Sequence, residues 1–168
     1  MVSYRFLGLQ LAANLSWSAN ATATVKKAQQ RLHFIRLLRK AGLSLSLHPL
    51  TQAYKGLVKS ILTTGITVWY GNTTQAERRA LQRVIKTAER IIKTKLPSMD
   101  TIYTQRCTKK VHSIIRDTHH PEYNLFKHKH STYSLRQSRT DCIITRKKRF
   151  YNSFFPATVR LMAKAKYH

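Results

Sequence analysis

The chain has 168 residues, a length typical of one domain or of one domain with a tail. It carries 31 Lys and Arg against only six Asp and Glu, which gives a formal net charge of +25. A charge this high excludes a generic housekeeping fold and indicates a polyanionic partner, because the cations otherwise repel one another.

Cysteine content and hydropathy predict where in the cell the protein is located. Two cysteines, Cys107 and Cys142, are too few for a disulfide framework and fit a reducing environment. The longest mainly apolar stretch, residues 61–70, is shorter than the roughly 20 residues that a bilayer span needs. The first residues also lack the basic start and apolar core of a signal peptide. We therefore expect an intracellular protein of the nucleus or cytoplasm, neither secreted nor membrane-bound.

The first half of the chain predicts a short β element and two helices. Near-alternate apolar residues and Gly8 in residues 4–11 favour a strand or hairpin arm. Thr22 or Thr24 can cap an amphipathic helix that Gly42 stops. Pro49 suits the first turn of a second apolar-striped helix that ends near Gly65. In residues 66–71 strand and helix compete, and we favour a buried helix end.

The second half begins with the two clearest helices. Thr74 and Glu77 form a capping box before an apolar stripe that runs to Pro97. Ser98 can cap a further helix to about Arg116, with Cys107 on its apolar face. Periodicity then fails over residues 117–149, a loose basic segment rich in His, Ser, Thr, Lys and Arg. Hydrophobic residues return from 150, where Pro156 bends or starts a last helix.

These elements predict a mainly α fold, a small helical bundle with a short N-terminal β element and a loose basic C-terminal segment. The expected divisions are a helical domain over 1–116, the loose segment over 117–149 and a C-terminal aromatic docking helix over 150–168.

Motifs for catalysis and metal binding are weak. The chain has no Asp-Asp pair, and two-metal polymerases need converging carboxylates. His120-Pro121-Glu122 is the only His-x-acid triplet, and its proline favours an exposed loop over an iron-binding facial triad. The two thiols lie too far apart in sequence for an ordinary structural zinc site, and no glycine-rich phosphate loop is present. We expect no catalytic residue, no metal and no cofactor.

Charge and aromatic residues carry the main functional prediction. Lys and Arg occupy the polar faces of at least two predicted helices, without paired acids on the first, and a basic run precedes Phe150 and Tyr151. Such a surface can track phosphates, with rings available for base stacking. Membrane-surface binding and a merely solvated charged face are the alternatives. The predicted RNA- or DNA-binding residues are Lys26, Lys27, Arg31, Arg36, Arg39, Lys40, Arg146, Lys147, Lys148 and Arg149.

Several strings occur in an order that resembles the carboxy-terminal part of LINE-type (non-LTR) retrotransposon reverse transcriptases, as found in fish genomes. The resemblance spans almost the whole chain. Its motifs include Phe6-Leu7-Gly8-Leu9, Leu15-Ser16-Trp17, Leu37-Leu38-Arg39-Lys40-Ala41-Gly42-Leu43, Ile66-Thr67-Val68-Trp69-Tyr70-Gly71-Asn72, Ala80-Leu81-Gln82-Arg83-Val84-Ile85, Leu96-Pro97-Ser98 and Asn152-Ser153-Phe154-Phe155-Pro156.

This resemblance implies a thumb-like region that grips a template-primer duplex. Phe6, Leu7 and Gly8 would form the primer-side edge, and the first helix would face nucleic acid. The catalytic palm of the family would lie upstream, so the resemblance implies a non-catalytic, truncated remnant. The family's Pro-Ser-Gly-Arg-Arg-Tyr-like string is replaced here by Lys129-His130-Ser131-Thr132-Tyr133-Ser134.

Residues 7–42 are also similar to the N-terminal domain family of an AlkB homologue. That similarity implies a module associated with a 2-oxoglutarate-dependent dioxygenase or tRNA methyltransferase, although no residue for either reaction is evident. Three functions stay open: a nucleic-acid-binding remnant, an AlkB-homologue N-terminal-like module, and a transposon-derived chain with no selected function.

Overall fold

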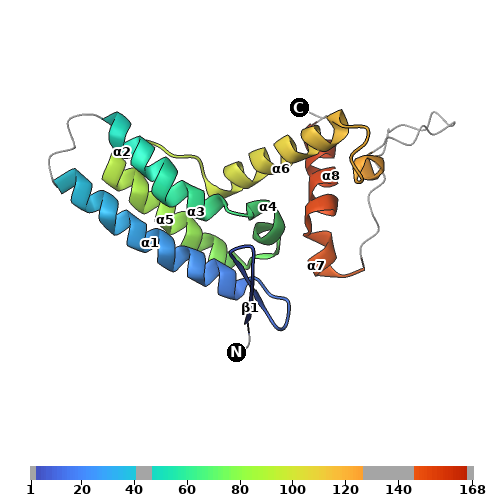
Figure 1. The fold of residues 1–168 in the computed structure, drawn as a ribbon, viewed down its shortest axis with the longest axis horizontal. Helices are drawn as coiled ribbons and strands as arrows, with labels where there is room; N and C mark the ends of the chain where they lie inside the picture. Colours follow the sequence, from blue (N-terminus) through green and yellow to red (C-terminus); the bar gives the residue numbers. More distant parts are fainter. Residues whose placement is uncertain (1–2, 41–46, 127–145, 166–168) are drawn as a thin grey trace. The chain divides into compact units, whose positions relative to one another are not determined.

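A computed structural model describes residues 3–40, 47–126 and 146–165. The described chain is mostly helical, with a two-stranded antiparallel sheet at its start (Figure 1). This confirms the predicted mainly α fold with a short β element. The chain divides into two compact units, Met1–Tyr103 and Thr104–His168.

The β element is a hairpin of β1 (Ser3–Phe6) and β2 (Leu9–Ala12), in a register that places Phe6 opposite Leu9. Leu7 and Gly8 form the turn, with φ values of 48° and 82°. Two consecutive positive φ values suit a two-residue turn, because its twist then matches that of the strands. The predicted β element is confirmed, but its turn falls at Leu7 and Gly8, inside the segment predicted as one strand or hairpin arm.

Helix α1 (Ser18–Lys40) begins before either predicted cap. Thr24 is buried, and Asn20 and Ala21 lie against neighbouring structure with at most 3% of their surface exposed. The Asn20 Oδ1 atom accepts a hydrogen bond from the Gln10 amide at 3.1 Å, which ties the helix to the hairpin. This tertiary contact explains why the predicted start at Thr22 or Thr24 is wrong. The predicted stop at Gly42 lies outside the described residues.

The second apolar stripe forms a helix that changes type along its length. It runs through α2 (Leu47–Tyr54), the π-helix η2 (Lys55–Lys59) and α3 (Ser60–Thr63). Gly65, with a φ of 57°, ends it and starts α4 (Ile66–Trp69), which is followed by the 3-10 helix η3 (Tyr70–Asn72). The helical prediction for residues 66–71 is confirmed. These residues do not continue the preceding helix, because the chain breaks at Gly65.

The two clearest sequence predictions are confirmed. In α5 (Gln75–Ile92) the capping box is complete: the Glu77 amide donates to Thr74 Oγ1 at 3.3 Å, and the Thr74 amide donates to Glu77 Oε2 at 2.7 Å. In α6 (Met99–Arg116) the Thr101 amide donates to Ser98 Oγ at 3.1 Å. Both caps satisfy amides that the first helical turn leaves unpaired.

The core of the first unit lies between α1, α5 and the helical segments from α2 to α4. Figure 1 shows α1, α2, α3 and α5 side by side, and contacts join α1 to both α3 and α5. Trp69 is fully buried, and its Nε1 donates to the Thr64 carbonyl at 2.8 Å. The largest buried side chains of this core are Trp69, Tyr54, Tyr70, Ile35, Leu62, Ile66, Leu81, Ile85, Ile92 and Met99.

The second unit has its own smaller core. Val111 and Ile114 of α6 pack with Phe126 of the 3-10 helix η4 (Tyr123–Phe126) and with Val159 of α8 (Phe154–Ala165). A short helix α7 (Lys148–Tyr151) precedes α8. Part of the predicted loose segment is thus packed, while residues 127–145 lie outside the described ranges. The division between the units falls inside α6 rather than at residue 116, and the predicted domain boundaries stay a prediction.

Gly65 supplies the first testable prediction, because its left-handed backbone conformation strains any side chain and a Cβ atom would also make Leu9 shift. Its φ is 57°, and a Cβ atom would lie 2.8 Å from Leu9 Cδ1. We expect Gly65→Ala to lower the free energy of unfolding by about 1 to 3 kcal/mol. Urea unfolding followed by tryptophan fluorescence measures this unit, since Trp17 and Trp69 both belong to it.

Gly56 is the matched control. A Cβ atom there meets nothing within 4 Å, and the residue lies inside a helix. We expect Gly56→Ala to raise the unfolding free energy by about 0.5 to 1 kcal/mol, because alanine restricts the unfolded chain. Equal stability of the two variants would contradict the proposed role of Gly65.

Tyr54 supplies a second prediction, on alkaline stability. Burial, and next the charge of Glu89, raise the pKa of Tyr54 from 10.0 to about 12. Between these two values the unfolded phenol loses its proton while the folded one keeps it, so stability falls as pH rises. We expect Tyr54→Phe to remove this loss, so that its stability relative to the wild type grows between about pH 10 and about pH 12.

Urea unfolding at neutral and alkaline pH measures that difference. At neutral pH the variant should equal or exceed the wild type, because the buried Tyr54 Oη has no hydrogen-bond partner among the described residues. A stability difference that is the same at every pH would show that Tyr54 does not titrate as described.

Candidate nucleic-acid interface

The predicted binding residues of α1 are mostly solvent-exposed. Lys26, Lys27, Arg31, Arg36 and Lys40 are exposed, and α1 contains no acidic residue. The core side of the helix is formed by apolar residues such as Leu32 and Ile35. The structure therefore places these five cations where an external partner can reach them. Their role in binding stays a prediction.

Arg39 differs from the other α1 cations. Its Nη1 donates to the backbone carbonyls of Arg90 and Ile91 in the last turn of α5, and its side chain is only partly exposed. The last carbonyls of a helix have no partners within the helix and carry partial negative charge. Arg39 therefore joins α1 to the end of α5, a structural contact that the sequence pattern does not reveal.

The exposed cations of α1 are not all on one side. A helix turns by about 100° per residue, so Lys27 and Arg31 lie along one edge of the exposed face while Arg36 lies along the other. Arg36 is on the edge toward α5, since it lines a groove with Arg83 and Val84.

A basic stripe on α5 was missed by sequence reasoning. We define the α5 stripe as Arg79, Arg83, Lys86, Arg90 and the C-cap residue Lys93, all of which are exposed. Their spacing of four and three residues places them on one face of the helix, opposite the buried Leu81, Val84 and Ala88. The same spacing of cations is present in the sequence, but the prediction for this helix used only its apolar residues.

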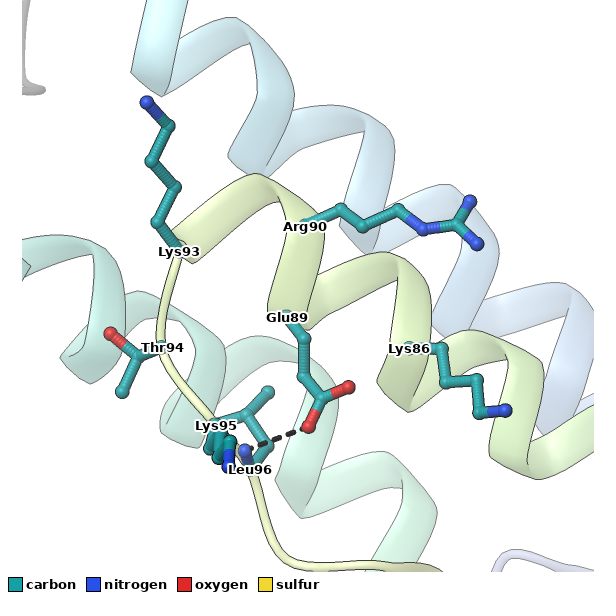
Figure 2. Close-up of a pocket in the computed structure, with 7 residues that line it drawn as sticks. All are labelled: Lys86, Glu89, Arg90, Lys93, Thr94, Lys95 and Leu96. Atoms are coloured by element: carbon teal, nitrogen blue, oxygen red, sulfur yellow. Dashed lines mark hydrogen bonds between the residues drawn. The ribbon is translucent and has the colours of Figure 1, made fainter.

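The two acids of α5 do not neutralise the stripe. Glu77 completes the capping box, and Glu89 Oε1 accepts a hydrogen bond from the Leu96 amide at 3.0 Å. Figure 2 shows Glu89 turned toward Leu96, while Lys86, Arg90 and Lys93 extend away from it. These residues surround an open hollow of about 540 Å³ at the end of α5. The cations thus remain available to solvent anions.

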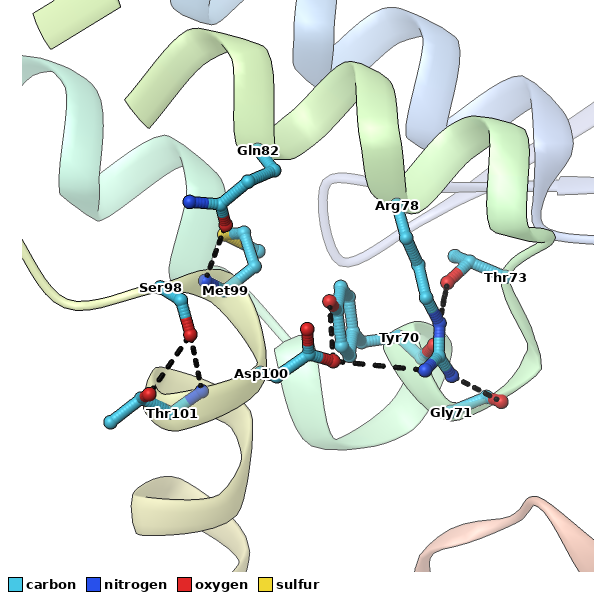
Figure 3. A network of polar contacts seen from close by, with 9 residues as sticks. All are labelled: Tyr70, Gly71, Thr73, Arg78, Gln82, Ser98, Met99, Asp100 and Thr101. Atoms are coloured by element: carbon cyan, nitrogen blue, oxygen red, sulfur yellow. Dashed lines mark hydrogen bonds and ion pairs between the residues drawn. The ribbon is translucent and has the colours of Figure 1, made fainter. Parts of the chain in front are cut away.

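One further cation of α5, Arg78, makes structural contacts with the segment before α5 and with the start of α6 (Figure 3). Its Nη2 donates to the Gly71 carbonyl at 3.2 Å, its Nε donates to Thr73 Oγ1 at 3.3 Å, and its Nη1 lies 3.7 Å from Asp100 Oδ1. The Tyr70 hydroxyl donates to the same Asp100 oxygen at 3.0 Å. Burial, and next the charge of Asp100, raise the pKa of Tyr70 well above its usual range. We therefore exclude Arg78 from the stripe.

The other predicted binding residues lie in the second unit. Arg146, Lys147, Lys148 and Arg149 are exposed at the start of α7. Of the nearby rings, Tyr151 has a face covered by Arg160, whose guanidinium carbon lies 3.5 Å from the ring centroid. Phe150 is exposed. Because these residues and the α5 stripe belong to different units, we treat them as separate candidate surfaces.

The hairpin turn holds the predicted primer-side edge. Phe6 is 72% exposed and Leu7 is 82% exposed, and Gly8 completes the turn. Apolar side chains this exposed are available for contact with a partner. The structure places the three residues together at one end of the hairpin. Their contact with a primer stays a prediction.

The residues considered as metal ligands in the sequence lie in a core or in a turn. Cys107 is fully buried, which confirms its predicted place in a core. His120 Nδ1 accepts a hydrogen bond from the Glu122 amide at 3.2 Å within a turn. Cys142 lies outside the described residues. In the described ranges, no group of three or more His, Cys, Asp or Glu side chains is arranged to hold a metal ion. Nor does any described helix have the length and apolarity to cross a membrane.

Comparison with known proteins gives one match. Residues 17–59 match the model of a family described as alkylated DNA repair protein alkB homolog 8, N-terminal. The matched range covers α1, α2 and the π-helix, and it leaves most of the chain outside. It begins later and ends later than the predicted similarity over 7–42, which included the hairpin turn and β2. No curated protein and no solved structure matches the chain.

The contrast between Arg39 and Arg36 is testable. Arg39→Ala removes the hydrogen bonds from a charged donor to two carbonyls, so we expect the unfolding free energy to fall by about 1 to 3 kcal/mol. Arg36→Ala, one turn earlier on the exposed face, should change it by less than about 0.5 kcal/mol. Urea unfolding followed by tryptophan fluorescence compares the two. Arg39 would count as a surface cation if both variants unfolded like the wild type.

Proposed function

We propose that the unit Met1–Tyr103 binds the phosphate backbone of RNA or DNA without sequence specificity. The observation that carries the proposal is the α5 stripe, five exposed cations on one helix face, none of which forms an ion pair with an acid among the described residues. Arg36 and Lys40 extend it from the neighbouring edge of α1. Phosphate contacts of this kind supply most of the affinity of non-specific nucleic-acid binding.

The dimensions of the stripe suit a nucleic-acid strand. From Arg79 to Lys93 the helix rises about 21 Å at roughly 1.5 Å per residue. Successive cations are therefore spaced about 5 Å apart along the helix, close enough to engage consecutive phosphates. Lys and Arg side chains supply charge and hydrogen-bond donors without selecting a base, so the partner is a backbone rather than a sequence.

The proposed role is non-catalytic. Each of the three acids in this unit, Glu77, Glu89 and Asp100, makes a structural contact in the capping box, with the Leu96 amide or with Tyr70 and Arg78. A two-metal site needs carboxylates that converge on the ions. These acids instead stabilise helix ends and the α5–α6 contact, and the unit acts as a binding module.

Two biological settings fit such a module. The family match over residues 17–59 supports an AlkB-homologue N-terminal-like module, which would work beside a catalytic dioxygenase or methyltransferase domain. A thumb-like remnant of a LINE-type reverse transcriptase rests on the motif resemblance alone. The first setting has the stronger support, and it predicts a preference for folded RNA. A chain with no selected function is the third possibility.

A salt series tests the binding proposal. The probes are labelled RNA and DNA duplexes of about 20 base pairs, each of which is longer than the stripe. We expect affinity to fall steeply with salt and the triple variant Arg79→Gln, Lys86→Gln, Arg90→Gln to show a slope shallower by about 2 to 3. Fluorescence anisotropy measures both the affinity and the slope.

The matched control removes the same charge from exposed positions of the other unit, in the triple variant Arg106→Gln, Lys109→Gln, Lys110→Gln. Net charge alone predicts equal losses in the two triple variants, whereas the stripe predicts the larger loss in α5. No binding by the folded wild type near physiological salt would overturn the proposal. A labelled folded tRNA that bound much more tightly than the duplexes would favour the AlkB-homologue setting.

A further inference from the structure

The groove between α1 and α5 has features that the open basic stripe lacks. It encloses about 240 Å³ and is lined by Gln29, Leu32, Arg36, Arg83, Val84 and Thr87. Leu32 and Val84 form a floor with 2% of their surface exposed. Arg36 comes from α1 and Arg83 from α5, so each of the two helices contributes one arginine to the lining of the recess.

We infer that this groove is a discrete binding site for one phosphate group, held between the guanidinium groups of Arg36 and Arg83. The inference rests on the proposed function and adds one position at which the bound nucleic-acid backbone is fixed relative to the protein. Where the stripe attracts a backbone through charge alone, the groove would seat one backbone phosphate in one place.

The chemistry of the lining supports a phosphate. Guanidinium groups are planar and donate paired hydrogen bonds that match phosphate oxygens. Gln29 and Thr87 add polar side chains, although the Thr87 hydroxyl already donates to the Arg83 carbonyl at 2.8 Å. An apolar floor excludes water from one side of the recess, which strengthens the attraction between opposite charges. None of the six lining residues is acidic.

The larger hollow at the end of α5 is the poorer candidate for a phosphate. It contains Glu89, and it lies at the C-terminal end of the helix, where the helix dipole repels anions. Figure 2 shows that the side chains of Lys86, Arg90 and Lys93 diverge rather than converge there. The α1–α5 groove has neither an acid nor a helix C-terminus in its lining.

A charge-preserving substitution separates a phosphate site from general electrostatic attraction. We expect the double variant Arg36→Lys, Arg83→Lys to bind the labelled duplex about tenfold more weakly at constant salt, because lysine cannot make the paired hydrogen bonds of guanidinium. The control variant Arg5→Lys, Arg106→Lys makes the same change at two exposed arginines outside the α5 stripe and the groove, and it should bind like the wild type. Fluorescence anisotropy measures all three proteins.

A second pair of variants tests the recess from the other direction. Gln29→Glu places a carboxylate in the groove, while Gln30→Glu makes the same change at an exposed residue that does not line it. We expect the larger loss of affinity from Gln29→Glu. Unfolding curves followed by tryptophan fluorescence confirm that each variant is folded.

The outcomes distinguish the two proposals. Salt-dependent binding by the wild type, with both Arg-to-Lys variants equal to it and both Gln-to-Glu variants equal to each other, would overturn the groove site and leave the binding module in place. No binding by the folded wild type would overturn both. A selective loss in the Arg36 and Arg83 variant and in Gln29→Glu supports the groove.

Discussion

The packing of α1 against α5 is the contact on which the other features of the first unit depend. Both helices contribute fully buried residues to one core, among them Ala28 and Ile35 from α1 and Leu81 and Ala88 from α5. Removing that much apolar surface from water is the main stabilising contribution available to a unit of this size. The same contact places Arg39 beside the last carbonyls of α5 and Arg36 beside Arg83. The shared core, the Arg39 contact with the end of α5 and the Arg36–Arg83 groove therefore all depend on the packing of these two helices.

The few acids explain how so basic a unit folds and why its surface stays positive. Glu77 completes the cap of α5, Glu89 binds the Leu96 amide, and Asp100 joins Tyr70 to Arg78 (Figure 3). Each carboxylate is engaged at a point where two elements meet or a helix begins. Under the proposed function, a bound polyanion would relieve the repulsion among the exposed cations of α5.

The family match and the basic surface cover different parts of the unit. The match ends at residue 59, before α5 begins, so it includes the exposed cations of α1 but not the stripe. In the structure the two parts form one core, and Arg36 from the matched segment lines a groove with Arg83 from the unmatched one. A binding surface that crosses this boundary is a property of the whole unit. Resemblance over a single segment therefore describes only part of the proposed interface.

Sequence alone determined the features that depend on local spacing. The capping box at Thr74, the Ser98 cap and the apolar stripe of α5 follow from residue types a few positions apart, because the interactions that form them are local. The α5 stripe belongs to this group as well, since its four- and three-residue spacing is readable without a structure.

Only the tertiary structure decided the features that join distant segments. Arg39 makes a structural contact, and is not a free surface cation, because α5 ends beside it. The Arg36–Arg83 groove exists because α1 and α5 pack side by side. The start of α1 at Ser18 follows from contact with the hairpin, which overrides the caps at Thr22 and Thr24. Residues far apart in sequence meet only through folding, so no local pattern carries the information that places them together.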